Sequence, residues 1–265
     1  MDKVNTLIPR FRRLSISEQV MLGAFGIFCF VYPFAILLLS FDWMPFGMEW
    51  MSSLLLAMLG VASWAWLVVN FGRGGLLAGA TVFVLGLTLE YVGVSTGVPF
   101  GQYRYTGVLV PELPGGLPLA IGFAWLLIVV SGLFTAQQLL SRLAPKGWII
   151  GLLGATLAVG LDLLLEPVAY HIKGYWQWLE PSGSYYGVPW SNFATWFVAA
   201  FLMNLGVYSL LGQHPNLKWN WLPSALYGMN VVMFGLVNLT HGFWVAGTVA
   251  LVLIGVMAVS LLKRR

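Results

Sequence analysis

The stretch GATLAVGLDLLLEPVAY, residues 154–170, decides the fold, because it is apolar over the length of a membrane span and still contains Asp162 and Glu166. A second apolar stretch, TVFVLGLTLEYVGV (81–94), contains Glu90. A carboxyl group at the bilayer centre costs roughly 2.5–3.5 kcal/mol on insertion scales, so it is seldom kept without a partner or a task. The chain has only nine acidic residues. Three of them in such places indicate a functional site inside a membrane protein.

The composition of the whole chain agrees with this interpretation. Of its 265 residues, 59% are hydrophobic and 8% are charged, whereas soluble domains carry about 25% charged residues. The basic residues lie at the ends of apolar segments and not along a polar face, which argues against a nucleic-acid partner. The single Cys29 allows no intrachain disulfide. We therefore expect an all-α polytopic membrane helix bundle, with residues 1–265 as one integral membrane domain.

Eight segments are apolar enough to cross a membrane, which takes about 20 residues. They are residues 19–40, 51–70, 75–95, 118–140, 147–168, 191–211, 222–239 and 243–262. The seventh is short and the connection at 239–242 is tight, so seven spans plus a re-entrant segment is the alternative.

The basic residues predict the orientation of these spans. Eight spans place eleven lysines and arginines on the side of the termini, and only Arg104 and Lys173 on the other side. Cytoplasmic loops carry the excess of basic residues in membrane proteins. We therefore expect a multi-pass protein of the cell (plasma) membrane with both termini in the cytoplasm.

Two long outer loops, residues 96–117 and 169–190, are unusually rich in Tyr, Trp, Gly and Pro. Loops this apolar are expected to fold back over the helix bundle. The two regions also resemble each other. Glu90 is followed by YRY, then Pro118 and Trp125; Glu166 is followed by YWQW, then Pro189 and Trp196. If this weak repeat reflects symmetry, Glu90 and Glu166 are equivalent residues.

The three acidic residues form the candidate catalytic group. Asp162 and Glu166 are four residues apart and share a helix face, and Glu90 lies late in a span that also runs outward. Two close carboxyl groups in an apolar setting cannot both ionise easily, so one would remain protonated and could donate its proton. The structural alternative is that Glu90 pairs with Arg104 and Glu166 pairs with Lys173.

A second set of residues is predicted to surround these acids. Tyr103, Tyr105, Trp176 and Trp190 are expected to line a substrate pocket, with Tyr175 and Trp196 in the same aromatic cluster. Aromatic faces stabilise a desolvated cation by about 2 kcal/mol or more. Asn192 lies at the predicted pocket mouth, His171 is a candidate proton relay, and Arg104 is expected to hold the loop and an acid in place.

Several kinds of chemistry are not supported by the sequence. No lysine lies inside a span, which excludes an opsin-type Schiff base, and there is no Walker motif, CxxC or HExxH. Prenyltransferases of membranes use two aspartate-rich motifs, and only one D-x-x-x-E pair exists here. Because hard cations take several oxygen ligands, we expect no metal. A lipid or an ion is the expected substrate.

Three blocks of sequence resemble the CruF-type carotenoid hydratases: residues 89–125, residues 161–178 and residues 185–197. The G-x-YxYT and LD-xxx-EP patterns are the specific parts, and the resemblance extends over roughly residues 85–240. That family includes gamma-carotene and lycopene 1,2-hydratases and an archaeal bisanhydrobacterioruberin hydratase. The resemblance implies water addition across the terminal double bond of an acyclic end group, a carotenoid substrate of the lycopene or gamma-carotene type, no redox cofactor, and other carotenoid enzymes as partners.

Hydration of an alkene needs an acid, a sheltered cation and a water activated by a base. We expect Glu166 or Glu90 to donate the proton and Asp162 to orient the water. A carotene cyclase or isomerase is the alternative enzyme, since it shares the protonation step. A proton-coupled lipid transporter is the non-enzymatic alternative. It should expose its acids to both sides in turn, whereas all three acids here are predicted to lie in the outer half.

Overall fold

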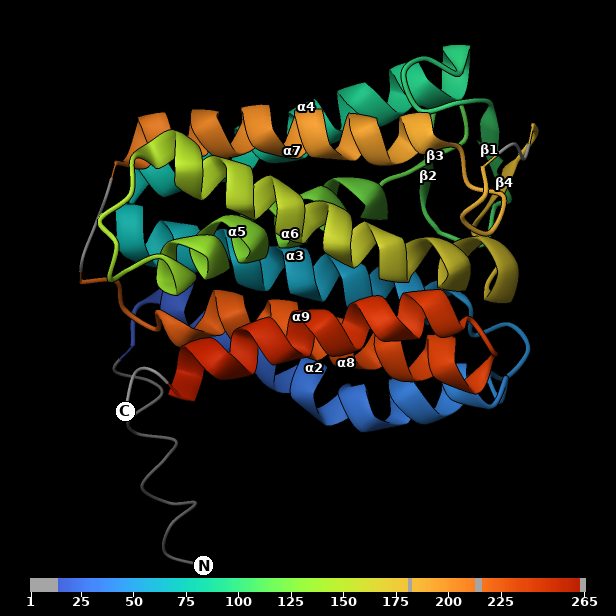
Figure 1. Ribbon diagram of the computed structural model, residues 1–265, viewed down its shortest axis with the longest axis horizontal. Helices are drawn as coiled ribbons and strands as arrows, with labels where there is room; N and C mark the ends of the chain where they lie inside the picture. The colour runs from blue at the N-terminus through green and yellow to red at the C-terminus, as the bar shows by residue number, and fades with distance from the viewer. Residues whose placement is uncertain (1–13, 181–182, 213–215, 263–265) are drawn as a thin grey trace, which may run out of the picture.

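The computed structural model describes residues 14–180, 183–212 and 216–262, and in these ranges eight helices lie side by side in one bundle (Figure 1). They are α2 (Ile16–Ser40), α3 (Trp50–Phe71), α4 (Arg73–Thr96), α5 (Ala120–Leu139), α6 (Gly147–Pro167), α7 (Trp190–Leu211), α8 (Trp221–Thr240) and α9 (Trp244–Leu262). Each predicted span corresponds to one of these helices, with ends that differ by no more than three residues.

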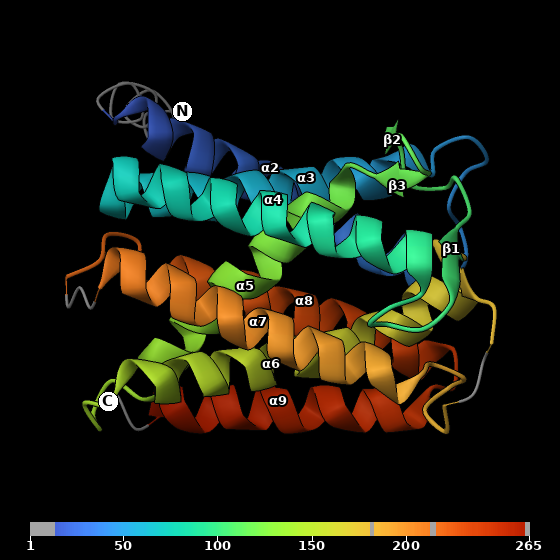
Figure 2. The ribbon, with the colours of Figure 1, turned by 90° about the horizontal axis from the view of Figure 1, so that it is seen from above.

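Seven of these helices, α2 to α8, are long and apolar enough to cross a membrane. The apolar part of α9 within the described residues is Trp244–Ala258, and this helix runs along the whole bundle beside α6 and α8 (Figures 1 and 2). The all-α class and the multi-pass character predicted from the sequence are therefore confirmed. The helix α9 does not have the form of a short re-entrant segment.

The start of the first helix and the end of the last helix lie at the same end of the bundle. In Figure 2, α2 begins and α9 ends on the left, whereas the β-strands lie on the right. This arrangement is what an even number of passes produces. The basic residues on which the predicted orientation depends are partly outside the described ranges, namely Lys3, Arg10, Arg12, Arg13, Lys263, Arg264 and Arg265. The cytoplasmic location of the termini stays a prediction.

The helix α5 forms the axis of the bundle. In the most apolar part of α5, 89% of the residues are buried, whereas the corresponding share in α2 is 17%. Figure 2 shows α5 crossing between the other helices. Its neighbour α4 approaches closely because Gly86 has no side chain: a Cβ atom there would lie 2.6 Å from Cγ of Trp125 on α5. This close contact brings Trp125 within reach of Glu90, one turn further along α4.

The two long loops form short strands at one end of the bundle. Strand β1 (Tyr103–Tyr105) pairs antiparallel with β4 (Trp176–Trp178), so that Tyr103 faces Trp178 and Tyr105 faces Trp176. Strands β2 (Glu112–Leu113) and β3 (Leu117–Pro118) form a separate pair. Because side chains alternate along a strand, the aromatic residues of β1 and β4 point into the bundle and the residues between them point out. The sequence predicted that these loops fold back, but not that they pair as strands.

The C-terminal end of α6 is irregular, and Pro167 is the cause. Proline has no N–H group to donate to the carbonyl oxygen four residues earlier, which belongs to Leu163, and the chain continues as a π-helical turn, η1 (Val168–Ile172). The hydroxyl of Tyr185 donates to the Leu163 carbonyl at 2.7 Å. The amide of Asn238 donates to the Leu164 carbonyl at 2.8 Å. These two side chains fix the irregular turn directly after Glu166.

Candidate active site

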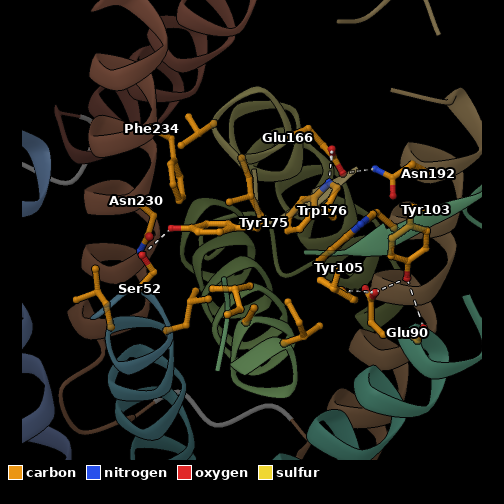
Figure 3. A pocket seen from close by; sticks show the side chains of 18 of the residues that line it. Ser52, Glu90, Tyr103, Tyr105, Glu166, Tyr175, Trp176, Asn192, Asn230 and Phe234 are labelled. Atoms are coloured by element: carbon orange, nitrogen blue, oxygen red, sulfur yellow. Dashed lines mark hydrogen bonds between the residues drawn. The ribbon is translucent and has the colours of Figure 1, made fainter. Parts of the chain in front are cut away.

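An apolar cavity lies beneath β1 and β4, with an empty volume of about 960 Å³ (Figure 3). Most of its lining is leucine, other aliphatic residues and aromatic rings. The lining residues that carry a polar side-chain atom are Ser52, Glu90, Tyr103, Tyr105, Glu166, Tyr175, Trp176, Trp178, Asn192, Trp196 and Asn230. Glu90 and Glu166 therefore line the same cavity from two different helices.

Glu90 on α4 is buried and held by three neutral donors. Its Oε2 accepts hydrogen bonds from the hydroxyls of Tyr103 at 2.7 Å and Tyr105 at 2.9 Å. Its Oε1 accepts a bond from the indole N–H of Trp125 at 3.2 Å. A buried polar group needs such partners, because burying it without a hydrogen bond costs free energy.

Glu166 on α6 has a matching environment. Its Oε2 accepts hydrogen bonds from the indole N–H groups of Trp176 and Trp178, both at 3.2 Å. Its Oε1 accepts a bond from the side-chain amide of Asn192 at 3.0 Å. Three neutral donors thus hold each of the two glutamates, and none of these donors carries a charge.

Asp162 lies one turn from Glu166 and is connected to it through Asn192. The same amide nitrogen of Asn192 that binds Glu166 also donates to Oδ2 of Asp162 at 3.1 Å. Asp162 is only 1% exposed and is not among the residues that line the cavity. Its Oδ1 has no hydrogen-bond partner among the described residues. Asp162 is therefore placed behind Glu166, not beside the substrate space.

The repeat noticed in the sequence has a geometric counterpart in this site. Tyr103 and Tyr105 bind Glu90, and their partners across the strand pair, Trp178 and Trp176, bind Glu166. The two tryptophans that follow the repeated prolines, Trp125 and Trp196, stack with ring centroids 4.0 Å apart and planes 8° apart. The two acids thus bind the two strands of one antiparallel pair, although Trp125 binds Glu90 whereas Asn192, and not Trp196, binds Glu166.

The two tyrosines on β1 are held in the neutral form. Burial raises the pKa of Tyr105 well above its usual value, and the nearby Glu90 carboxyl raises this pKa further. The pKa of Tyr103 is raised for the same two reasons. Both hydroxyls therefore keep the proton that they donate to Glu90 throughout the neutral pH range.

Besides Asp162, three of the predicted site residues do not line the cavity. Arg104 is exposed on the outer side of β1, where its guanidinium donates to Oε1 of Gln177 and not to a carboxyl group. His171 is exposed and its Nε2 lies 2.8 Å from the backbone oxygen of Tyr186. Trp190 is 58% exposed and packs against Phe193. The prediction that Arg104 holds an acid is wrong, because strand alternation turns its side chain outward.

The salt-bridge alternative is also not what the structure shows. Among the described residues the ion pairs are Lys218 with Glu18 and His241 with Asp42. Glu90 and Glu166 bind only aromatic and amide donors. The described residues contain no group of three or more His, Cys, Asp or Glu side chains that could hold a metal ion.

Two residues that bind the acids were absent from the predicted site. Trp178 binds Glu166, and Trp125 binds Glu90. A signal for Trp178 was present in the alternating Y-R-Y and W-Q-W triplets, since alternation in a strand places both outer residues of each triplet on one face. Trp125 belongs to the sequence repeat but lies 35 residues from Glu90 along the chain, so its contact required the three-dimensional structure.

The fold and the site together define a multi-pass membrane protein with two carboxyl groups sheltered in an apolar cavity. The chain belongs to the carotenoid biosynthesis protein family, whose profile matches residues 49–257. It is similar to the bisanhydrobacterioruberin hydratase of Haloarcula japonica, with 31% identity over 179 residues. That match covers 65% of this chain and 59% of the relative's length. No solved structure matches the chain.

Proposed function

We propose that this protein adds water across the terminal 1,2 double bond of an acyclic carotenoid end group. The observation that carries the proposal is that Glu90 and Glu166 face one apolar cavity, each held by three neutral donors. The family supports a carotenoid substrate, and the archaeal relative is named as a hydratase. Water addition is redox neutral and therefore needs no redox cofactor.

The two glutamates differ in a way that suggests separate roles. Glu90 receives two short bonds from phenol hydroxyls, and such bonds stabilise a carboxylate. Glu166 receives longer bonds from indole groups and is joined through Asn192 to a second carboxyl group, Asp162. We assign Glu166 as the proton donor, and Asp162 is the second carboxyl group that Asn192 holds behind it. Glu90 then accepts the proton that the attacking water loses.

In this mechanism the proton of Glu166 adds to the less substituted carbon of the alkene, and a tertiary cation forms. The aromatic faces around the cavity, above all Tyr105, Trp176 and Trp196, shelter this cation. Water adds to the tertiary carbon and releases one proton to Glu90. Transfer of a proton from Glu90 back to Glu166 completes the cycle, and the net reaction consumes one water. The role of Asp162 as the water-orienting base, expected from the sequence, passes to Glu90 because Asp162 does not line the cavity.

Isotope labelling tests the proposal directly. Expression in a host that accumulates lycopene first shows whether the pigment is converted. The purified protein is then supplied with lycopene in heavy water or in oxygen-18 water. We expect one deuterium on the carbon next to the carbinol carbon, and a hydroxyl oxygen that comes from water. The same experiment without molecular oxygen should give the same product.

Three outcomes would each support a different function. A hydroxyl oxygen that derives from molecular oxygen would make the protein a hydroxylase. A closed ring with deuterium and no hydroxyl would establish the cyclase alternative. Movement of pigment or protons across vesicles without a new product would establish a transporter.

A further inference from the structure

A second apolar cavity lies between α2 and α3 and shares part of its lining with the acidic cavity. It has an empty volume of about 630 Å³. Three residues, Leu39, Ser52 and Leu55, line both cavities. Its outer wall includes Phe34 and Leu54, which are 54% and 45% exposed. Both helices are apolar and long enough to span a membrane, so we expect these exposed side chains to face lipid and the second cavity to lie between the lipid and the acidic cavity. We call it the α2–α3 groove.

Ser52, which lines both the groove and the acidic cavity, lies at the end of the acidic cavity away from the acids (Figure 3). Figure 3 shows Ser52, Tyr175 and Asn230 on one side of the cavity, and Glu90 and Glu166 on the other. The hydroxyl of Tyr175 donates to the Ser52 hydroxyl at 2.7 Å, so this pair marks the junction between the two spaces. A molecule that enters from the groove must pass Tyr175 before it reaches the acids.

We propose that the α2–α3 groove binds the polyene chain of a carotenoid while the end group of the same molecule occupies the acidic cavity. This inference rests on the proposed function, because it places the reacting end group at Glu90 and Glu166. A conjugated polyene is long and stiff, so it cannot fold up within a cavity that also holds its end group. The chain must leave opposite the acids, where the groove begins.

The lining of the groove fits such a chain. It is almost entirely apolar, with Ser52 as its single polar residue. Met44, Met51 and Met58 lie along it. Methionine side chains are flexible and polarizable, and they adapt to irregular apolar partners. The groove therefore provides an apolar, adaptable wall that recognises length and apolarity and no particular functional group.

A variant with a narrower groove tests the proposal by pigment binding alone, so catalytic turnover is not required. The full-length protein in lipid nanodiscs is titrated with lycopene, and binding is followed by the change in the visible spectrum of the pigment. Met58→Trp should weaken lycopene binding by about tenfold, the scale of an overpacked contact. Farnesene is a short acyclic isoprenoid with the same type of end group, and its binding, measured by competition, should weaken far less. Leu77→Trp is the matched control, because Leu77 is 63% exposed on α4 and lines neither cavity.

If Met58→Trp does not fold, Leu54→Trp narrows the same groove at a side chain that is already partly exposed. Unchanged lycopene affinity in the folded variants would overturn the proposal. Equal losses for lycopene and farnesene would also overturn it, because the acidic cavity itself would then be disturbed. A loss of copurified phospholipid with unchanged lycopene binding would identify the groove as a lipid site instead. Wild-type protein that binds lycopene through the groove but adds no water would refute only the proposed function.

Discussion

Neutral hydrogen-bond donors surround Glu90 and Glu166, whereas in a structural ion pair each carboxylate would bind a positively charged side chain. An arginine or lysine beside a carboxyl group would hold it in the charged form. Indole, phenol and amide groups satisfy the carboxyl oxygens without adding positive charge. At each glutamate the chain therefore keeps a group that can both hold and release a proton inside an apolar cavity.

Replacing either glutamate with glutamine tests the role of these groups. Glu166→Gln and Glu90→Gln retain the size and part of the hydrogen bonding of the side chain but cannot transfer a proton. We expect the rate of water addition to fall by about 10²- to 10⁴-fold, the usual contribution of a general acid or base. The measurement is the yield of hydroxylated pigment per folded protein. Glu112→Gln, at an exposed acid on β2, is the control and should keep full activity. Loss of folded protein in both cavity variants would indicate a structural role.

The hydroxyl of Tyr105 is expected to matter for rate more than for folding. Tyr105→Phe removes one donor to Glu90 Oε2 and leaves the bond from Tyr103 in place. A hydrogen bond to a charged group is worth about 1.5–3 kcal/mol, so turnover should fall by roughly 10- to 100-fold. Because the pKa of Tyr105 is raised, the hydroxyl stays protonated, and the wild-type rate should show no loss from phenol ionisation up to at least about pH 10. An alkaline decline below that pH that Tyr105→Phe abolishes would contradict this role.

At the scale of elements, the helices were predictable and the strands were not. Each span followed from about 20 apolar residues, which a bilayer requires whatever the tertiary contacts. The pairing of β1 with β4 joins residues more than 70 positions apart. No local pattern determines such a register, and a strand of three residues is too short to stand out from a loop. The cavity itself depends on this register, which turns Tyr105 and Trp176 inward and Arg104 outward.

The same distinction applies to the candidate site. The rarity of acids in apolar segments was enough to select Glu90, Asp162 and Glu166. Which of them face the cavity depends on the rotation of α4 and α6, and this rotation is set by close contacts such as that of Gly86 with Trp125. The separation of Asp162 from the cavity by Asn192 could not be inferred from spacing alone.

The turn after Glu166 provides a prediction about an element. Tyr185 donates to the Leu163 carbonyl that Pro167 leaves without a backbone partner. Tyr185→Phe should leave this buried carbonyl unpaired and lower the free energy of unfolding by about 1–3 kcal/mol. Turnover should fall as well, because η1 and β4 would no longer hold Trp176 and Trp178 against Glu166. Thermal stability in detergent is the first measurement and pigment hydration the second. Tyr91→Phe, at a tyrosine that is 50% exposed, should change neither. Unaltered stability in Tyr185→Phe would show that another group satisfies the carbonyl.

At the scale of the whole molecule, the site lies at one end of the bundle, under a cover made by two loops. The acids on α4 and α6 both lie near the end that carries β1 and β4 (Figure 2). The opposite end holds the start of α2 and the end of α9. The position of the acids at one end, together with the proposed α2–α3 groove, favours an enzyme that takes an apolar substrate from the bilayer over a transporter.

The orientation of the bundle is the last prediction. The predicted topology divides the basic residues eleven to two between the two sides of the membrane, and the excess of lysine and arginine marks the cytoplasmic side. The covered acidic cavity should therefore lie in the outer half of the membrane, which we expect to be the plasma membrane. A reporter fused within the loop at Gly183 should be active only outside the cell, and a reporter after residue 265 only inside. If both reporters are active outside, the chain crosses the membrane an even number of times after Gly183, and eight spans are refuted. Reversed results at both positions would keep the bundle but place the cavity in the cytoplasmic half, where the carotenoid end group would have to approach from the inner leaflet.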